Sequence, residues 1–117
     1  MSGAKWKLDN LTAILDRNNL QNDYAVDEVM PIEPVSDKWQ AFGWNVLEID
    51  GHDMKAVVNA LEAARSFKDA PTMIIANTVK GKGVSFMENV CEWHGKAPAQ
   101  DEADQALEEI RRCISEY

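Results

Sequence analysis

The sequence is poor in cysteine and has no long apolar run. Its 117 residues include two cysteines, Cys91 and Cys113, which form neither a Cys-x-x-Cys pair nor a disulfide framework. We therefore expect reduced thiols, a cytoplasmic protein and no zinc cluster. No apolar run approaches the roughly 20 residues that a membrane-spanning helix needs. Residues 1–5 do not lead into the apolar core of a secretory signal, so none is expected.

Basic residues are scarce relative to acidic ones. The chain has 12 Lys and Arg residues against 20 Asp and Glu residues, which gives a formal net charge of −8. Proteins that bind nucleic acid or anionic membranes usually carry the opposite sign or a basic stripe, so neither partner is expected. The hydrophobic fraction of 45% is sufficient for a packed core. The length corresponds to one domain, which we place over residues 1–117.

Three short apolar runs have the character of β-strands. They occupy residues 11–16, 45–50 and 72–78, and each is bounded by Gly, Pro, Asn or Asp. Runs of this length with no clear period suit strands that are covered on both faces, although a buried helix has a similar pattern.

Helical patterns separate these runs. Residues 36–42 predict a short helix that ends at Gly43. Asp53 is a good N-cap for a second helix, which fades near residues 66–68. A third helix begins at Asp101, with acidic residues in its first turn and Arg111 and Arg112 near its end. The apolar stripes of the two longer helices are Met54, Val57, Val58, Leu61 and Ala64, and Ala103, Ala106, Leu107, Ile110 and Ile114.

The alternation of strands and helices predicts a three-layer α/β unit with a parallel sheet. Two long segments, residues 20–35 and 79–100, follow the first and third strands. Long loops in a compact domain usually build a site, and ligands of open parallel sheets bind at the carboxyl ends of strands. A three-stranded sheet is small for this architecture. We therefore expect an oligomer, by self-association or with a second chain, that covers the exposed sheet.

The first candidate site is the polar segment at residues 16–20. Asn side chains and main-chain carbonyl groups supply the oxygen ligands that Mg²⁺ prefers. A polar turn without a metal explains the same composition, because Asn tolerates tight turns.

The second and third candidates lie in the later loop. The run Lys80-Gly81-Lys82-Gly83 lets backbone approach an anion and adds a point charge, although a solvated turn has the same pattern. His94 could donate to a phosphate group or move a proton, but a single His is more often structural. His52 falls in a strand-to-helix turn and is assigned no chemistry.

Several separated motifs together resemble transketolase. The similarity is to the later part of the N-terminal, diphosphate-binding domain, and it extends over nearly the whole chain. Its motifs are Lys-Leu-Asp-Asn-Leu-Thr-Ala-Ile-Leu-Asp-Arg-Asn (7–18), Asp-Gly-His-Asp (50–53), Thr-Val-Lys-Gly-Lys-Gly-Val-Ser-Phe-Met-Glu (78–88) and Trp-His-Gly-Lys-Ala-Pro (93–98).

The resemblance implies thiamine diphosphate and Mg²⁺ as cofactors. It implies that Asn18 binds Mg²⁺ through its side chain and that Leu20 does so through its carbonyl group. Lys80 and His94 match positions at the diphosphate, and His94 also lies near the reacting substrate. The implied activity is transfer of a two-carbon ketol unit between sugar phosphates, in the pentose phosphate pathway, with the difficult chemistry on the cofactor.

The sequence also departs from the family pattern. Transketolases open this metal motif with Gly-Asp-Gly, whose Asp is a further Mg²⁺ ligand, and no Gly-Asp-Gly occurs here. The early histidines of the sugar channel and the pyrimidine-binding domain with its glutamate are not matched. Gln21 stands where Gly is common. We therefore expect a truncated domain that by itself binds both cofactors weakly or not at all.

Three interpretations remain open at this stage. The leading one is a part of a divided transketolase, active only when another polypeptide completes it. The second is a transketolase-derived interaction or scaffold domain without catalysis. The third is a truncated product with no independent role.

Overall fold

The computed structural model describes residues 1–115 and divides into two units. Unit 1 comprises Met1–Arg17 and Ile32–Thr78, and unit 2 comprises Asn18–Pro31 and Val79–Tyr117. The last two residues of the expected domain, 116–117, lie outside the described part.

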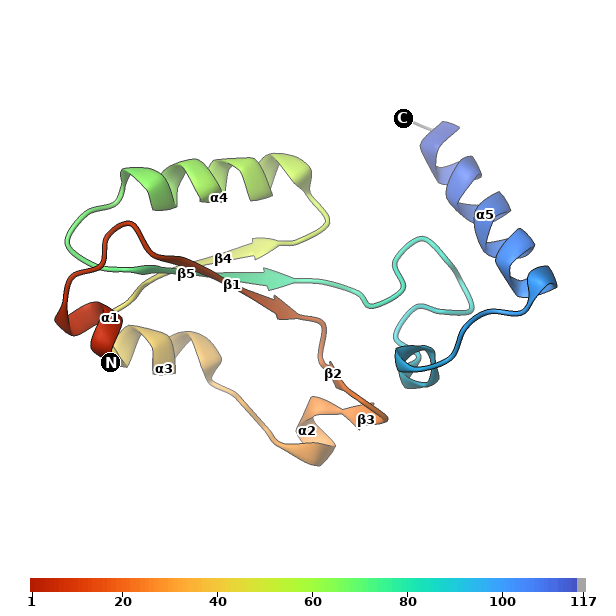
Figure 1. Cartoon of the computed structure of the whole chain (residues 1–117), viewed down its shortest axis with the longest axis horizontal. Helices are drawn as coiled ribbons and strands as arrows, with labels where there is room; N and C mark the ends of the chain where they lie inside the picture. Colours follow the sequence, from red (N-terminus) through yellow and green to blue (C-terminus); the bar gives the residue numbers. More distant parts are fainter. Residues whose placement is uncertain (116–117) are drawn as a thin grey trace. The chain divides into compact units, whose positions relative to one another are not determined.

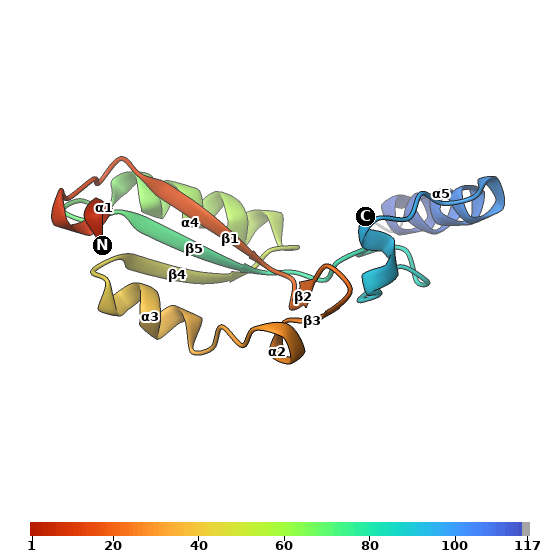
Figure 2. The same cartoon turned by 60° about the horizontal axis from the view of Figure 1, so that its bottom comes forward.

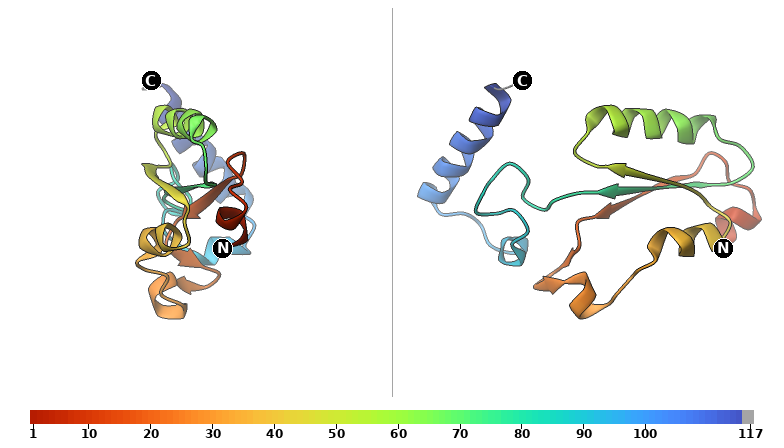
Figure 3. Two further views of the ribbon diagram at one scale, coloured as in Figure 1. Left: turned by 90° about the vertical axis from the view of Figure 1, so that its left-hand side faces the viewer. Right: turned by 180° about the vertical axis from the view of Figure 1, so that it is seen from behind.

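Unit 1 is the predicted three-layer α/β arrangement. Its sheet contains β1 (Thr12–Arg17), β5 (Thr72–Asn77) and β4 (Asn45–Asp50) in the order β1-β5-β4, and both neighbouring pairs are parallel. Helix α4 (Met54–Ser66) covers one face of this sheet and α3 (Val35–Ala41) covers the other (Figures 1 and 2). The left view of Figure 3 looks along the strands and shows the sheet between α4 and α3. The expected fold class is therefore confirmed.

The central strand β5 explains why its sequence shows no period. Residues Thr72–Ala76 are all buried, because each face of β5 packs against a helix. Met73 and Ile75 join Val35, Trp39 and Trp44 on the α3 side. Ile74 packs against α4, where the small residues Ala60 and Ala64 allow a close approach. Burial of a side chain such as Ile74 contributes about 1.5–3 kcal/mol.

The edge strand β1 is covered less completely. Its residues alternate between half-buried and exposed, and Ile14 is 60% exposed. The strand also begins and ends one residue later than predicted, because the parallel register pairs Thr12 with Thr72 and Arg17 with Asn77. The expectation of full cover on both faces is wrong for this strand.

The helices of unit 1 lie where they were predicted, with small shifts in their bounds. The apolar stripe predicted to pack α4 on the core is only partly buried, because Met54, Val58 and Leu61 are 68%, 49% and 43% exposed and α4 meets the sheet through Ala60 and Ala64. Asp53 caps α4 as expected, since its carboxylate accepts hydrogen bonds from the backbone amides of Lys55 and Ala56. Helix α3 begins at Val35, one residue earlier than predicted, and Val35 is buried. A further short helix, α1 (Ser2–Lys5), was not predicted.

Unit 2 contains residues 20–31 of the first segment that was predicted as a long loop, and all of the second, residues 79–100. The first forms a small hairpin of β2 (Leu20–Gln21) and β3 (Tyr24–Ala25), followed by α2 (Val26–Val29). The second contains the 3₁₀ turn η1 (Cys91–His94) and leads into α5 (Gln100–Ser115), one residue before the predicted helix start. Residues 20–35 are thus not an irregular loop, although their strands are only two residues long.

Candidate functional site

The chain leaves unit 1 twice from neighbouring strand ends. Strands β1 and β5 are parallel and adjacent, and their last residues, Arg17 and Asn77, are register partners. The amide of Thr78 donates to the carbonyl oxygen of Arg17 at 3.3 Å. The carboxyl ends of parallel strands are where open α/β sheets place their ligands. Both segments of unit 2 begin at this edge, as the sequence predicted.

The Asn18 side chain is fixed by the turn that follows β1. Its Oδ1 accepts a hydrogen bond of 2.9 Å from the amide of Leu20. Asn19 takes a left-handed conformation, with φ of 63°, and its carbonyl oxygen accepts from the amide of Val26. A carbonyl-type oxygen has two lone pairs, so Oδ1 of Asn18 retains one acceptor position. The turn therefore orients Oδ1 of Asn18 and leaves it able to accept one further hydrogen bond or to bind a cation.

Lys80 is the first residue of a loop whose two ends are joined by a backbone hydrogen bond. The carbonyl oxygen of Lys80 accepts from the amide of Asn89 at 3.0 Å, which brings both ends of residues 80–89 together. Gly81 has φ of 76°, and a Cβ there would lie 2.5 Å from the carbonyl oxygen of Met87. Only glycine fits this position, which gives the Lys-Gly-Lys-Gly run a structural reason.

The two lysines of this loop have different surroundings. The ammonium group of Lys82 pairs with the carboxylate of Glu88 at 3.5 Å. That of Lys80 has no hydrogen-bond or ion-pair partner among residues 1–115. Lys80 is half-buried, and its charge is therefore available to an anionic group.

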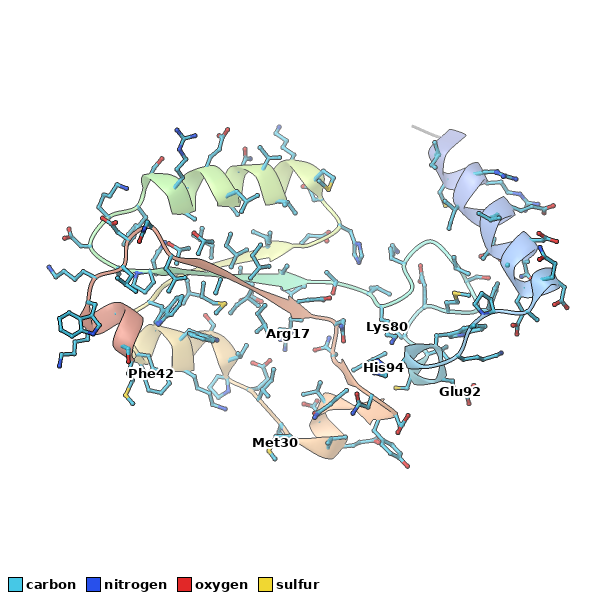
Figure 4. The ribbon with its side chains drawn as sticks, viewed as in Figure 1. Arg17, Met30, Phe42, Lys80, Glu92 and His94 are labelled. Atoms are coloured by element: carbon cyan, nitrogen blue, oxygen red, sulfur yellow. The ribbon has the colours of Figure 1, made fainter. Side chains whose placement is uncertain are left out.

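His94 is the last residue of η1. Its imidazole has no hydrogen-bond or ion-pair partner within the described part of the chain. The preceding residue, Trp93, anchors the turn by donating from Nε1 to the carbonyl oxygen of Phe86 at 3.1 Å. Figure 4 labels both residues: Lys80 comes from the loop of residues 80–89, and His94 comes from η1.

Helix α5 is attached to the same loop by Glu109. The carboxylate of Glu109 accepts from the amide and the hydroxyl of Ser85, at 2.6 and 2.9 Å. The Ser85 amide, the Gln105 side chain and the Ser85 hydroxyl all lower the pKa of Glu109 below its usual 4.5. The first turn of α5 is capped by Glu102, whose pKa is lowered by Lys96 and by the amide of Ala99.

A cavity of about 280 Å³ brings the predicted site residues together in unit 2. It is slightly smaller than the roughly 300–1,000 Å³ of most ligand pockets, so it suits one polar group of a larger ligand. All four predicted residues line it, together with two that were not predicted as site residues. The complete lining is Asn18, Leu20, Gln21, Asn22, Lys80 and His94.

The two additional residues follow from the hairpin. Gln21 ends β2, and Asn22 begins the connection to β3 with φ of 50°. The sequence marked Gln21 as a departure from a common glycine, but it gave no sign that either side chain would line a cavity. That placement depends on the hairpin, whose strands are too short to leave a pattern.

The donor set of this cavity fits a magnesium-bound diphosphate in part. The Lys80 ammonium and the imidazole of His94 are suitable for phosphate oxygens. The amide oxygen of Asn18 and a main-chain carbonyl at Leu20 are hard ligands for Mg²⁺. No carboxylate lines the cavity, and no cluster of three His, Cys, Asp or Glu residues able to hold a metal occurs within residues 1–115. Most of the charge that balances Mg²⁺ would therefore come from the diphosphate.

The remaining residues considered in the sequence lie outside this cavity. His52 is exposed in the turn after β4, where its backbone amide donates to Asp50 Oδ1 at 2.8 Å. Cys91 lies on η1 and Cys113 on α5, and both are free thiols. Across the described residues, no helix has the length and apolar character needed to cross a membrane.

Comparison with protein families gives one match over almost the whole chain. Residues 1–111 match the model described as "Transketolase, thiamine diphosphate binding domain". Among curated relatives, an apulose-4-phosphate transketolase subunit of Phocaeicola vulgatus is 40% identical over 114 residues, which cover 97% of this chain and 41% of the relative. The 6-deoxy-6-sulfo-D-fructose transketolase subunit SqwG of a Clostridium species is 41% identical over 106 residues, covering 91% and 38%. This chain thus spans about two fifths of their length.

A solved structure supports the same relationship. The crystal structure of transketolase from Campylobacter jejuni superimposes with a TM-score of 0.86 at 32% identity, and the match covers 93% of this chain and 17% of that one.

Proposed function

The chain belongs to the family of thiamine diphosphate binding domains of transketolases, and from this we propose that it forms part of a divided transketolase. In this proposal residues 1–117 are the later part of the diphosphate-binding domain. A second polypeptide supplies the pyrimidine-binding half, and the assembly transfers two-carbon ketol units between sugar phosphates. Two relatives carry the word "subunit" in their names, which supports a partner chain.

The observation that carries the proposal is the cavity of unit 2. It gathers the candidate metal and diphosphate ligands from two segments that are about 60 residues apart in the sequence. In the proposed complex, Asn18 Oδ1 and the carbonyl oxygen of Leu20 bind Mg²⁺, while Lys80 and His94 donate to diphosphate oxygens. His94 also donates to the reacting sugar. When bound, thiamine diphosphate supplies the nucleophilic carbon for ketol transfer.

The same cavity explains why we expect low affinity in the isolated chain. Two neutral oxygens bind a hard cation poorly without a carboxylate, because affinity rises with ligand charge. We propose that the partner chain, or a part of the enzyme that it carries, completes the anionic ligand set. Ketol transfer is then a property of the assembly.

Calorimetric titration with inorganic diphosphate and Mg²⁺ tests the anion site directly. Lys80→Ala is expected to weaken binding about tenfold or more, since it removes a charge-assisted hydrogen bond. Lys82→Ala is the matched control: it removes the same charge from the same loop, but Lys82 is already paired with Glu88. Equal losses in the two variants would contradict a specific role for Lys80.

Co-purification tests the divided enzyme. The tagged chain is recovered from its source cells in the presence of Mg²⁺ and thiamine diphosphate, and its partners are identified by mass spectrometry. A partner that carries Gly-Asp-Gly and a pyrimidine-binding domain, with ketol transfer restored in the complex, is the expected result. Recovery of the chain alone, without cofactor binding, would instead support the non-catalytic scaffold.

A further inference from the structure

We propose that Trp93 is a positioning residue that holds His94 and Lys80 in a fixed arrangement for the diphosphate. This inference rests on the proposed function of the cavity, but it concerns a residue that does not line it. His94 itself gains no orientation from side-chain bonds, because the described residues offer its imidazole no partner. Its position is therefore set by the turn to which it belongs.

The indole of Trp93 makes one hydrogen bond and two ring contacts. Its Nε1 donates to the carbonyl oxygen of Phe86 at 3.1 Å. Its ring meets the Phe86 ring in a T-shaped contact, with 5.6 Å between centroids and 61° between planes. The ammonium group of Lys96 lies 4.2 Å from the ring centroid, within the range of a cation–π interaction.

The contact with Phe86 connects His94 to the loop that begins with Lys80. Phe86 lies between Lys80 and Asn89, whose backbone hydrogen bond closes that loop. Val84 in the same loop is 5% exposed and provides a packed base. A displacement of Trp93 would therefore change the position of His94 relative to Lys80.

The contact with Lys96 extends the support to α5. Lys96 pairs with Glu102 at 2.8 Å, and Glu102 accepts from the amide of Ala99 at 2.8 Å in the first turn of the helix. The Trp93 ring thus contacts both the loop, through Phe86, and the cap of α5, through Lys96. Partners of this kind, which act through a ligand-binding residue, commonly change affinity by about 10–100-fold when they are removed.

Nuclear magnetic resonance of the full chain provides a direct readout. The chain contains two histidines, His52 and His94, so the ring Cε1–Hε1 signals give one site signal and one internal reference. We expect Trp93→Ala to shift the His94 signal while leaving the His52 signal unchanged. Inorganic diphosphate with Mg²⁺ is expected to bind this variant about tenfold more weakly.

Two further variants separate positioning from a general loss of structure. Trp93→Phe keeps a ring but lacks the Nε1–H donor, and it is expected to weaken diphosphate binding about threefold with the fold intact. Trp6→Ala is the matched control, because Trp6 is 69% exposed in unit 1 and also carries a lysine over its ring. It is expected to change neither the His94 signal nor the affinity.

The outcomes distinguish this inference from the proposed function. If the His94 signal does not move in Trp93→Ala or Trp93→Phe, the positioning role is overturned. If the wild-type chain does not bind diphosphate while the His94 signal still moves, the function proposed for the cavity fails and the structural link between Trp93 and His94 stands. If Trp93→Ala does not fold, Trp93→Phe decides.

Discussion

Asn77 on β5 accepts a hydrogen bond of 3.1 Å from the Arg17 guanidinium on β1. The other nitrogen atoms of Arg17 contact the carboxylate of Glu33, which also accepts from the amide of Val35. Asn77 in turn donates through Nδ2 to Glu48 on β4 at 3.0 Å. All three strands are therefore connected by side chains at the carboxyl end of the sheet.

Substitution of Asn77 is expected to destabilise this end of the sheet. Asn77→Ala removes two hydrogen bonds at a half-buried position, which should lower the free energy of unfolding by about 1–3 kcal/mol. Urea denaturation measures the change. Glu62→Ala at an exposed position of α4 is the control, and it should be neutral or slightly stabilising because Ala favours helix. Equal effects in the two variants would show that the network contributes nothing.

Glycine-to-alanine substitutions in unit 2 are expected to destabilise the loop to different degrees, according to the φ angle of each glycine and the space around an added Cβ. Gly81→Ala combines φ of 76° with a clash against the Met87 carbonyl oxygen. Gly83→Ala has φ of 92° but open space around its Cβ, so it should cost only the left-handed penalty of roughly 1–2 kcal/mol. Gly95→Ala has neither problem and should be neutral. Hydrogen exchange of the Asn89 amide, which bonds to Lys80, reports opening of the loop.

A different ranking would be informative. If Gly81→Ala exchanged no faster than Gly95→Ala, the loop would have to tolerate a shift at Met87, and the closed form would not depend on glycine.

The contact between Glu109 and Ser85 is expected to depend on pH. The pKa of Glu109 is lowered in the folded state, chiefly by the amide of Ser85. A lowered pKa means that the contact contributes its full stability above the usual value of 4.5 and loses it as pH falls through the folded-state pKa. The chemical shift of the Ser85 amide, followed from about pH 6 to about pH 3, should report this loss.

Charge removal provides the control for that titration. Glu109→Gln should abolish the pH dependence at Ser85, whereas Glu62→Gln on α4 should leave it unchanged. A Ser85 amide that titrates equally in Glu109→Gln would assign the effect to another carboxylate.

The fold was predictable where burial controls the pattern. The central strand 72–77 was predicted nearly to the residue because both of its faces are buried. The bounds of helix 54–66 were predicted from its Asp53 cap and its apolar period, although much of that apolar stripe is exposed in the structure. The end of β1 was not, since Arg17 belongs to the strand through its register with Asn77 and not through any apolar pattern. Helix α1 and the β2–β3 hairpin are too short to show a period.

The site was predictable in part, for a related reason. Asn18, Lys80 and His94 were ambiguous on local composition, and the resemblance between ordered motifs selected them. The structure places them around one cavity. The sequence could not predict how these residues are brought together around the cavity. Their arrangement depends on contacts between residues separated in the chain, such as the hydrogen bond from the Asn89 amide to the Lys80 carbonyl oxygen and the hydrogen bond from Trp93 Nε1 to the Phe86 carbonyl oxygen.

The absence of a carboxylate from the cavity lining leads to a gain-of-affinity prediction. Asn18→Asp replaces the amide by a carboxylate of nearly the same shape, which can still accept from the amide of Leu20. If Asn18 Oδ1 is a Mg²⁺ ligand, the added charge should raise the affinity of the isolated chain for Mg²⁺ about tenfold, because hard-cation affinity follows ligand charge. Calorimetry and the shift of the Leu20 amide during Mg²⁺ titration measure the gain.

Asn22→Asp distinguishes direct coordination of Mg²⁺ by residue 18 from a general electrostatic attraction of Mg²⁺ to the cavity. It places the same charge elsewhere in the lining of the cavity, where no metal ligand is proposed. Direct ligation predicts a large gain for Asn18→Asp and a small one for Asn22→Asp, since a carboxylate outside the coordination sphere acts only through screened attraction. Equal gains would mean that the cavity attracts Mg²⁺ without Asn18 binding it, and the role proposed for Asn18 would be wrong.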